Sequence, residues 1–238
     1  MSALATDTAM VMAAGLGKRM RPLTATMPKP MVRVAGKPLI DHTLDRLAEA
    51  GLARAVVNVH YLADALEAHV LERAVPKVEI SDEREELLET GGGMVKAQGL
   101  LPDPFFCLNS DNIWLDGPRN AFAELSDRWD ANAMDALLLV VPHKQAGNFD
   151  GPGDFHLDAT GRVTRRKPGR IAPFIYTGIQ LVSHRLLRDA PMGKFSTNIL
   201  WSRAIEEERL FALPFTGQWF EVGTPAAIRP TEDALSRG

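Results

Sequence analysis

The chain has 238 residues, of which 45% are hydrophobic and 24% charged, and a formal net charge of −3. These values are typical of a globular protein that buries a sizeable core. The small negative charge excludes a global basic field that would recruit nucleic acid. No apolar run approaches the roughly 18 residues of a membrane-spanning helix, and the amino terminus has no signal-peptide pattern. The sequence therefore predicts a cytoplasmic protein that binds neither nucleic acid nor membrane.

The first part of the chain alternates between short apolar runs and amphipathic stretches. The predicted strands cover residues 9–14, 55–59, 78–80, 105–108 and 136–141. The predicted helices lie between them, at residues 38–50, 63–71, 94–101 and 121–132. This alternation predicts an α/β fold with a Rossmann-like, mostly parallel (mixed) sheet and helices on both faces.

Glycine and proline become dense from about residue 147. Further strands are predicted at residues 154–157, 175–182, 211–214 and 219–221, and helices at 197–208 and 225–235. No linker-like composition and no internal repeat separates the two parts. We therefore expect a single domain over residues 1–238, in which the later part forms a smaller lobe on the same sheet. The one cysteine, Cys107, lies in an apolar run and predicts a buried thiol.

The first predicted strand runs into a loop, residues 14–22, with the sequence AGLGKRMRP. Gly15 and Gly17 let the backbone approach a phosphate, and Lys18, Arg19 and Arg21 add positive charge. The spacing matches neither a Walker A loop nor a dinucleotide fingerprint. Taken alone, the loop is equally consistent with a solvated basic turn.

The segment that follows the loop aims a further positive charge at it. Prolines at positions 22, 28 and 30 stiffen this segment. Lys29 is therefore held on a rigid arm between two of them. The loop and the arm together predict a site for a charge-dense ligand such as a nucleoside triphosphate.

A carboxylate follows the apolar strand at residues 105–108. Asp111 lies at the carboxyl end of that strand, where Mg²⁺ is often held by one or two carboxylates together with substrate phosphates. The alternative is a turn, because Asn109, Ser110 and Asp111 all favour turns. The residues alone leave both interpretations open.

Residues 13–24, with the sequence AAGLGKRMRPLT, followed by PKP at 28–30, resemble the signature of the sugar-1-phosphate nucleotidyltransferases. The resemblance implies a fold of the glycosyltransferase-A type, a nucleoside triphosphate and a sugar 1-phosphate as substrates, and Mg²⁺ as cofactor. It implies catalytic roles for Arg19, Lys29 and Asp111. The residues that it implies for nucleotide binding are Ala13, Ala14, Gly15, Gly17, Lys18, Arg19, Glu83, Gly92 and Asn109.

The same resemblance implies a second metal carboxylate. The family has the pattern Trp-x-Asp-x-Gly-Thr, and residues 219–224 read WFEVGT here. Glu221 therefore replaces the usual aspartate and joins Asp111 as an expected metal ligand. Its side chain is one methylene longer, so the sequence leaves open whether it ligates directly or through water.

The sugar side of the resemblance lies in the later part of the chain. The expected sugar-phosphate-binding residues are Asp154, Lys167, Thr177 and Gly178. Arg166 stands where the family usually has glutamate before the Lys-Pro pair. Residues 9–146 would then be the nucleotide-binding part, and residues 147–238 the sugar-binding lobe with the carboxyl-terminal helices.

The block at residues 83–93, EREELLETGGG, resembles the version found in N-acetylmuramate 1-phosphate uridylyltransferases. This resemblance implies that UTP and N-acetylmuramate 1-phosphate are converted to nucleotide sugar and pyrophosphate, in cell-wall sugar recycling. A mannose- or heptose-1-phosphate guanylyltransferase is the alternative among enzymes. A non-catalytic nucleotide or sugar-phosphate sensor is the alternative of another class. The sequence does not decide between a monomer and a homodimer.

Overall fold

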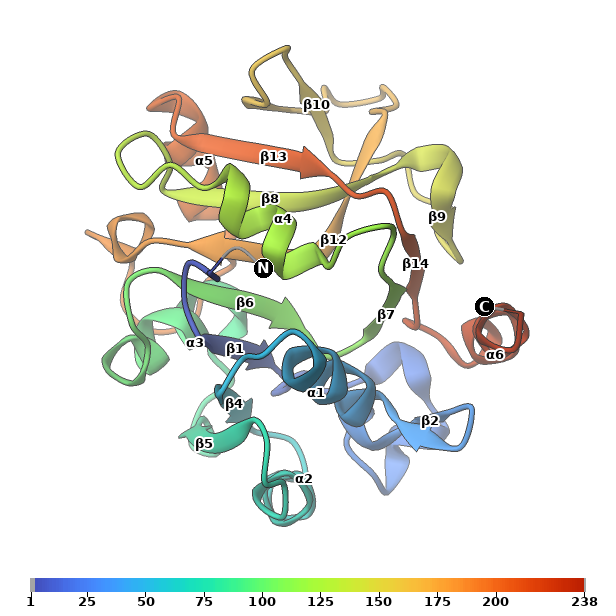
Figure 1. The fold of residues 1–238 in the computed structure, drawn as a ribbon. Coiled ribbons are helices and arrows are strands. Elements are labelled where there is room, and N and C mark those ends of the chain that lie inside the picture. Colours follow the sequence, from blue (N-terminus) through green and yellow to red (C-terminus); the bar gives the residue numbers. More distant parts are fainter. Residues whose placement is uncertain (1–2, 238) are drawn as a thin grey trace.

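The computed structural model describes residues 3–237, and within them the main sheet has nine strands (Figure 1). Seven strands lie side by side in the order β11 (Val163–Arg165), β10 (Phe155–Leu157), β12 (Phe174–Val182), β6 (Phe105–Asn109), β1 (Thr8–Met12), β4 (Arg54–Val59) and β5 (Lys77–Asp82). The other two are β8 (Ala136–Pro142), which pairs with β12, and β13 (Leu210–Pro214), which pairs with β8.

The sheet is mixed. β1 runs parallel to β4 and β6, β4 is parallel to β5, and β13 is parallel to β8. β12 runs antiparallel to β6, β8 and β10, and β10 is antiparallel to β11. The predicted fold class is confirmed, with a larger antiparallel share than expected, because β12 from the later part of the chain enters the middle of the sheet.

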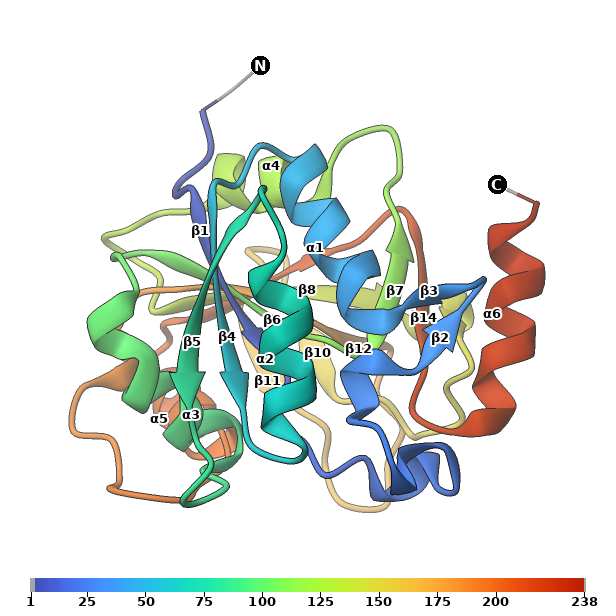
Figure 2. The ribbon, with the colours of Figure 1, turned by 90° about the horizontal axis from the view of Figure 1, so that it is seen from below.

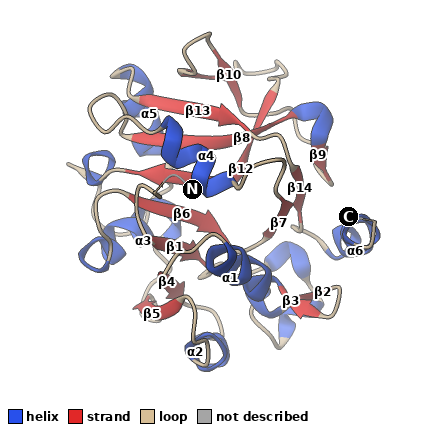
Figure 3. Ribbon diagram, in the orientation of Figure 1, coloured by secondary structure: helices blue, strands red, loops and turns tan. Residues whose placement is uncertain are grey.

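Helices cover both faces of the sheet (Figures 2 and 3). The α-helices are α1 (Leu39–Glu49), α2 (Ala63–Leu71), α3 (Glu89–Ala97), α4 (Ala121–Arg128), α5 (Asn198–Glu206) and α6 (Ile228–Leu235). Short 3-10 helices are η1 (Lys18–Met20), η2 (Leu23–Ala25), η3 (Lys29–Met31), η4 (Gln98–Leu100), η5 (His143–Gln145), η6 (His184–Leu187) and η7 (Pro225–Ala227). In the described part of the chain, no helix combines the length and the apolar character needed to span a bilayer.

The core has one layer on each face of the sheet. Side chains alternate along a strand, so in β1 Val11 packs with α1, α2 and α4 while Met10 packs with α3 and α5. Both residues are fully buried. This burial on both faces explains why the central strands are almost continuously apolar, as in other sheets covered on two sides.

A second, three-stranded sheet joins distant parts of the chain. β7 (Asn112–Leu115) pairs antiparallel with β14 (Gln218–Glu221), which also pairs with β9 (Ala146–Gly147). Glu221 lies opposite Asn112, and the N–H of Val222 donates to the carbonyl of Asp111 at 3.0 Å. This small sheet therefore brings the segment of Asp111 beside that of Glu221. A two-stranded ribbon, β2 (Arg33–Val34) with β3 (Lys37–Pro38), precedes α1.

The predicted strands and helices are found in the structure, but five strands of its described part were not predicted, namely β2, β3, β7, β9 and β11. β7 was not predicted, because its hydrogen bonds come from β14, far away in the sequence. The predicted helix at residues 94–101 begins earlier, at Glu89, so its three glycines lie inside the helix rather than in a loop before it. A Cβ on Gly91 would come within 2.3 Å of the Phe195 ring, so close packing, rather than helix propensity, explains a glycine here.

Candidate active site

The site lies where three parallel strands end at the same edge of the sheet. Met12 of β1 is in register with Asn109 of β6, and the N–H of Ser110 donates to the carbonyl of Met12. β4 ends beside them at Val59. Loops at the carboxyl ends of parallel strands form the usual ligand crevice of open α/β sheets. The glycine-rich loop and Asp111 therefore leave the sheet at one place.

The glycine-rich loop folds back onto the Lys29 arm. Gly17 has a φ of +60°, and a Cβ there would come within 3.0 Å of both the Lys29 Cβ and the Thr24 Cγ2. The Thr24 hydroxyl donates to the Gly17 carbonyl at 2.8 Å. The glycine is thus needed for both its backbone conformation and its close contact with the arm. Gly15, in contrast, is exposed, with open space where a Cβ would be.

A buried chain of hydrogen bonds holds the start of this loop. The backbone N–H of Ala13 donates to Asn58 Oδ1 at 2.6 Å, and Asn58 Nδ2 donates to Glu83 Oε1 at 2.7 Å. The other Glu83 oxygen accepts the N–H of Leu88 at 3.2 Å. Asn58 and Glu83 are both almost completely buried. The two side chains therefore anchor the start of the loop to β4 and to the residue that follows β5.

The predicted cations and carboxylates meet as two ion pairs. Lys29 Nζ lies 2.5 Å from Asp111 Oδ2, and Arg19 Nη2 lies 3.2 Å from Glu221 Oε1. The Lys29 side chain is only 13% exposed, whereas that of Arg19 is 66% exposed. The Lys29–Asp111 pair is thus more shielded from water than the Arg19–Glu221 pair. The attraction between the charges is therefore stronger in the Lys29–Asp111 pair.

Three neighbouring cavities occupy this edge. The loop cavity, of about 400 Å³, is lined by Met12, Ala13, Ala14, Gly15, Lys29, Pro30, Asn58, Leu87, Glu89, Thr90, Asn109, Ser110, Asp111 and Ser196. The aromatic cavity, of about 460 Å³, is lined by Met12, Thr90, Cys107, Asn109, Gly153, Asp154, Phe155, Arg165, Arg166, Tyr176, Gln180, Ser196, Thr197, Asn198 and Trp201. The carboxylate cavity, of about 210 Å³, is lined by Arg19, Asn109, Asp111, Asn112, Phe149, Asp154, Ile175, Tyr176, Trp219 and Glu221.

Asn109 lines all three cavities. The loop and aromatic cavities also share Met12, Thr90 and Ser196. A ligand in one cavity can therefore approach a ligand in the other. The glycine-rich backbone, Lys29 and Asp111 line part of the first, whereas aromatic rings line much of the second. This arrangement suits two substrates, one rich in phosphate and one with a sugar-like ring.

Residues 8–237 match the nucleotidyl transferase family. The chain belongs to this family. It is 43% identical, over 96% of each chain, to the N-acetylmuramate alpha-1-phosphate uridylyltransferase of Caulobacter vibrioides. It is 30% identical to the mannose-1-phosphate guanylyltransferase catalytic subunit beta of Danio rerio, over 91% of this chain and 61% of the relative.

The fold agrees with this membership. The structure of the inositol-1-phosphate CTP transferase from T. maritima superposes with a TM-score of 0.80 at 17% identity, over 98% of this chain and 96% of the other. The mixed sheet with flanking helices is therefore the glycosyltransferase-A-like fold of nucleotidyltransferases. As a member of this family the chain is a nucleotidyltransferase enzyme.

Most residues predicted for the nucleotide and the metal line the cavities of this nucleotidyltransferase. They are Ala13, Ala14, Gly15, Lys29, Asn109 and Asp111 in the loop cavity, and Arg19 and Glu221 in the carboxylate cavity. Asp154, predicted for the sugar side, lines both the aromatic and the carboxylate cavities. Gly17 and Lys18 lie outside the three cavities, and Lys18 is exposed to solvent.

Two residues predicted to bind the nucleotide lie away from the cavity surface in this structure. Glu83 is fully buried under the loop cavity and acts on Ala13 through Asn58, so it does not reach a ligand. Gly92 lies inside α3, where its N–H donates to the Phe195 carbonyl. A Cβ on Gly92 would be 2.3 Å from the Gly193 carbonyl oxygen. The Gly193 backbone therefore packs against Gly92, and the contact of Gly92 with a base stays a prediction.

Three residues predicted for the sugar side line none of the three cavities, and their contacts with the sugar phosphate stay predictions. Thr177 is fully buried, and its hydroxyl donates to the Leu139 carbonyl at 2.8 Å, so it is not free to bind a sugar. Gly178 has a φ of +84°, and a Cβ there would lie 2.2 Å from Asn112 Nδ2. The Asn112 amide therefore fills the space assigned to a sugar. Lys167 is exposed and lines none of the three cavities.

The thiol of Cys107 lines the aromatic cavity but is not a nucleophile. Burial raises the pKa of Cys107 to about 12, against a smaller opposing effect of a hydrogen bond with Gln180. Only the thiolate is nucleophilic. The thiol therefore stays protonated at neutral pH, as expected for the buried cysteine that the sequence predicts.

Oxygen donors at the carboxylate cavity fit a magnesium ion. Asp111 and Glu221 both line this cavity, and Mg²⁺ is commonly held by one or two carboxylates together with substrate phosphates. Within residues 3–237 no group of three or more His, Cys, Asp or Glu side chains could cage a metal. The residues thus fit an ion that shares its coordination with a phosphate ligand.

Sequence reasoning missed several cavity residues. Asn58 carried a usable signal, a lone polar residue in the apolar run that ends the second strand. Thr90 lay in the recognised block at residues 83–93 without being assigned a role. Ser196 and Asn198 carried no signal, because a hydrogen bond from the Thr197 N–H to the Thr90 hydroxyl brings their segment to the cavity from far away in the sequence. Arg165 stood beside a recognised motif without being assigned a role.

Proposed function

We propose that this nucleotidyltransferase transfers the uridylyl group of UTP to the phosphate of N-acetylmuramate 1-phosphate and releases pyrophosphate. The observation that supports it is that the loop cavity, which holds the Lys29–Asp111 ion pair, adjoins the aromatic cavity at Asn109. The name of the Caulobacter relative, 43% identical, supports the choice of substrates. Since N-acetylmuramate is a cell-wall sugar, the reaction would serve the recycling of such sugars.

The two substrates occupy neighbouring cavities in this proposal. The nucleoside lies in the loop cavity beside Ala13, Ala14 and Gly15, and the phosphates lie over the glycine-rich loop near Lys29. Because Asn58 already accepts the Ala13 N–H, Ala13 offers its carbonyl group instead. The sugar ring lies in the aromatic cavity, where Trp201 and Tyr176 pack edge to face with centroids 4.9 Å apart.

The chemistry is a substitution at the α-phosphorus. An oxygen of the sugar phosphate forms the new bond to the α-phosphorus, and the bond from that atom to the oxygen bridging to the β-phosphorus breaks. The electron pair leaves with pyrophosphate, and no proton transfer is needed, because the attacking phosphate is already ionised. Positioning and charge stabilisation therefore carry the rate. Lys29 and Arg19 exchange their carboxylate partners for phosphate oxygens.

Binding of a magnesium ion is part of the same proposal. Asp111 and Glu221 would hold Mg²⁺, which when bound neutralises phosphate charge. Residues 9–146 supply most of the nucleotide side and residues 147–238 most of the sugar side. Ser196 and Glu221 cross this division, since each lines a cavity with residues from the first part.

The test is pyrophosphate release in a matrix of triphosphates and sugar 1-phosphates. UTP, GTP, CTP and dTTP are each paired with the 1-phosphates of N-acetylmuramate, N-acetylglucosamine and mannose, with Mg²⁺. We expect the largest kcat/KM for UTP with N-acetylmuramate 1-phosphate. Release with other pairs but not with this one would refute the proposed substrates.

Guanylyl transfer to mannose 1-phosphate is the second candidate. The Danio rerio relative, at 30% identity over 91% of this chain, is the observation in its favour. The same matrix separates the two candidates. A maximum for GTP with mannose 1-phosphate would replace the uridylyl assignment.

A further inference from the structure

Arg165 brings a positive charge into the aromatic cavity. It lies at the end of β11, and its guanidinium carbon stands 5.8 Å from the centroid of the Phe155 ring. Its Nη1 and Nη2 donate to the side-chain oxygen and the carbonyl of Asn198 at 3.1 and 2.9 Å. The stacking and the two hydrogen bonds hold the guanidinium at the cavity wall.

This charge has no carboxylate partner within the described residues. Neither Arg165 nor Arg166 forms an ion pair with residues 3–237, and the buried Nε of Arg165 has no acceptor among them. Asp154 is the acidic residue among those lining the cavity, and one of its oxygens accepts the Tyr176 N–H at 2.9 Å. The lining therefore carries two positive charges against one negative.

Burial at the cavity wall disfavours the charged form of the guanidinium. Burial lowers the pKa of Arg165, and the nearby carboxylate of Asp154 only partly offsets this. Partly desolvated charges are normally paired or hydrogen-bonded. An anionic group on the bound ligand would supply the missing partner.

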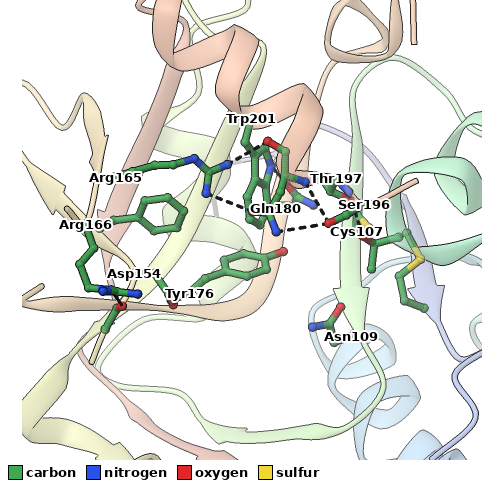
Figure 4. Close-up of a pocket in the computed structure, with 15 residues that line it drawn as sticks. Cys107, Asn109, Asp154, Arg165, Arg166, Tyr176, Gln180, Ser196, Thr197 and Trp201 are labelled. Atoms are coloured by element: carbon green, nitrogen blue, oxygen red, sulfur yellow. Dashed lines mark hydrogen bonds between the residues drawn. The ribbon is translucent and has the colours of Figure 1, made fainter. Parts of the chain in front are cut away.

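The 1-phosphate of the sugar is not that partner. The attacking phosphate must lie where the aromatic cavity joins the loop cavity, near Asn109 and Ser196. Figure 4 shows Arg165 and Arg166 across the cavity from Asn109 and Ser196. The arginines are therefore positioned for a different anionic group, on the side of the sugar away from its phosphate.

We propose that Arg165 binds a carboxylate carried by the sugar and thereby selects an acidic amino sugar. This inference rests on the proposed function, in which the lactyl ether of N-acetylmuramate provides the carboxylate. A guanidinium suits this role because its planar donors match a carboxylate in a bidentate contact.

Arg166 contributes differently. Its Nε donates to the Gly153 carbonyl at 3.0 Å and its Nη1 to the Arg170 carbonyl at 3.1 Å. The first bond holds Arg166, directly after β11, to the segment before β10, and the second closes the loop that runs from Arg166 to Arg170. Arg166 therefore shapes the wall and adds a second positive charge, while Arg165 makes the selective contact.

The experiment compares N-acetylmuramate 1-phosphate with N-acetylglucosamine 1-phosphate, which lacks only the lactyl group. kcat/KM is measured for both at saturating UTP in the wild-type enzyme and in Arg165→Gln. We expect the wild type to prefer the acidic sugar, and Arg165→Gln to lower its kcat/KM by about 10- to 100-fold. The value for N-acetylglucosamine 1-phosphate should change by less than about 3-fold.

Arg170→Gln is the matched control, because Arg170 is exposed on the same loop and lines none of the three cavities. It removes the same charge and should leave both values unchanged. A second measurement needs no variant. The wild type is assayed with N-acetylmuramate 1-phosphate whose lactyl carboxylate is converted to an amide, and we expect a loss similar to that of Arg165→Gln.

The outcomes separate this inference from the proposed function. Equal losses with both sugars in Arg165→Gln, or full activity with the amide, would overturn the role of Arg165 and leave the uridylyl assignment intact. If the wild type turns over neither sugar with UTP, the proposed function fails, and the inference that rests on it fails too.

Discussion

The loop cavity and the aromatic cavity differ in whether their positively charged side chains are paired with a carboxylate. In the loop cavity the cation Lys29 is paired with Asp111 at 2.5 Å. In the aromatic cavity Arg165 faces aromatic rings and has no carboxylate partner among the described residues. Paired charges can be exchanged when phosphates and a metal arrive together. An unpaired arginine instead favours a ligand that brings its own anion.

Under the proposed function, this difference gives the two cavities different roles. The paired groups face the phosphates, which all the substrates share, and the unpaired arginine faces the part of the sugar that varies. Changes in the first region should therefore lower turnover with all sugars, and changes in the second should alter the preference among them.

The largest effect is expected from Asp111→Asn. It removes a metal carboxylate and the partner of Lys29, so kcat should fall on the order of 10³-fold with every sugar tested. Pyrophosphate release measures the loss, and thermal unfolding checks the fold. Asp150→Asn, at an exposed position outside the cavities, is the control. Near-normal activity in Asp111→Asn would show that Asp111 does not bind the metal.

Glu221→Gln should have the next largest effect. The substitution keeps the shape but removes the charge that pairs with Arg19 at 3.2 Å. We expect a loss of about 10- to 100-fold in kcat, again with all sugars. Measuring the Mg²⁺ concentration that gives half-maximal rate tests the metal directly. If this concentration does not change while kcat falls, Glu221 acts by positioning Arg19 and not on the metal.

Asn58→Ala should weaken the support of the glycine-rich loop. It leaves the buried N–H of Ala13 and the Glu83 carboxylate without their partner. The free energy of unfolding should fall by about 1–3 kcal/mol, and the KM for UTP should rise while the KM for the sugar stays constant. Chemical denaturation and steady-state kinetics measure the two effects. An equal rise in both KM values would mean that Asn58 supports the whole edge.

Cys107→Ala should have the smallest effect on turnover. The thiol lines the aromatic cavity, but with a pKa of about 12 it is about one part in 10⁴ thiolate at pH 8. We expect kcat to stay within about 3-fold and the native wild-type thiol to react very slowly with a disulfide reagent. Rapid labelling at pH 8 would contradict the assigned burial.

The thiol also predicts a dependence of stability on pH. Its pKa is higher in the folded than in the unfolded protein, so the unfolded chain loses this proton first as pH rises. The stability that Cys107 contributes should therefore fall between about pH 9 and pH 12. Unfolding of the wild type and of Cys107→Ala, compared across this range, measures the difference.

Much of the fold could be predicted because local sequence patterns specify its strands, helices and loops. The apolar run that ends at Ala14 and the glycines that follow mark a strand and a phosphate loop without any knowledge of distant residues. Lys29 could be predicted for the same reason, since the prolines beside it restrict the chain locally. The place of Asp111 after an apolar strand left a metal site and a turn open, and the family resemblance implied the metal site.

The sugar side could not be predicted in the same way. Thr177 and Gly178 lie in a recognisable motif, yet their surroundings are set by Leu139 and Asn112, from other strands. Gly92 resembled a site for a base until the segment around Gly193 was seen packed against it. These positions are decided by contacts between segments that the sequence does not place side by side.

The sequence by itself determined the α/β architecture and the place of the glycine-rich loop, which follow from short-range stiffness, periodicity and spacing within a few residues. The roles expected of Arg19, Asp111 and Glu221 were implied by the family resemblance. Only the tertiary structure decided that Lys29 pairs with Asp111, that Arg19 pairs with Glu221 and that Arg165 stands unpaired. The reason is physical, because ion pairing and burial depend on distances through space that only the packed chain defines.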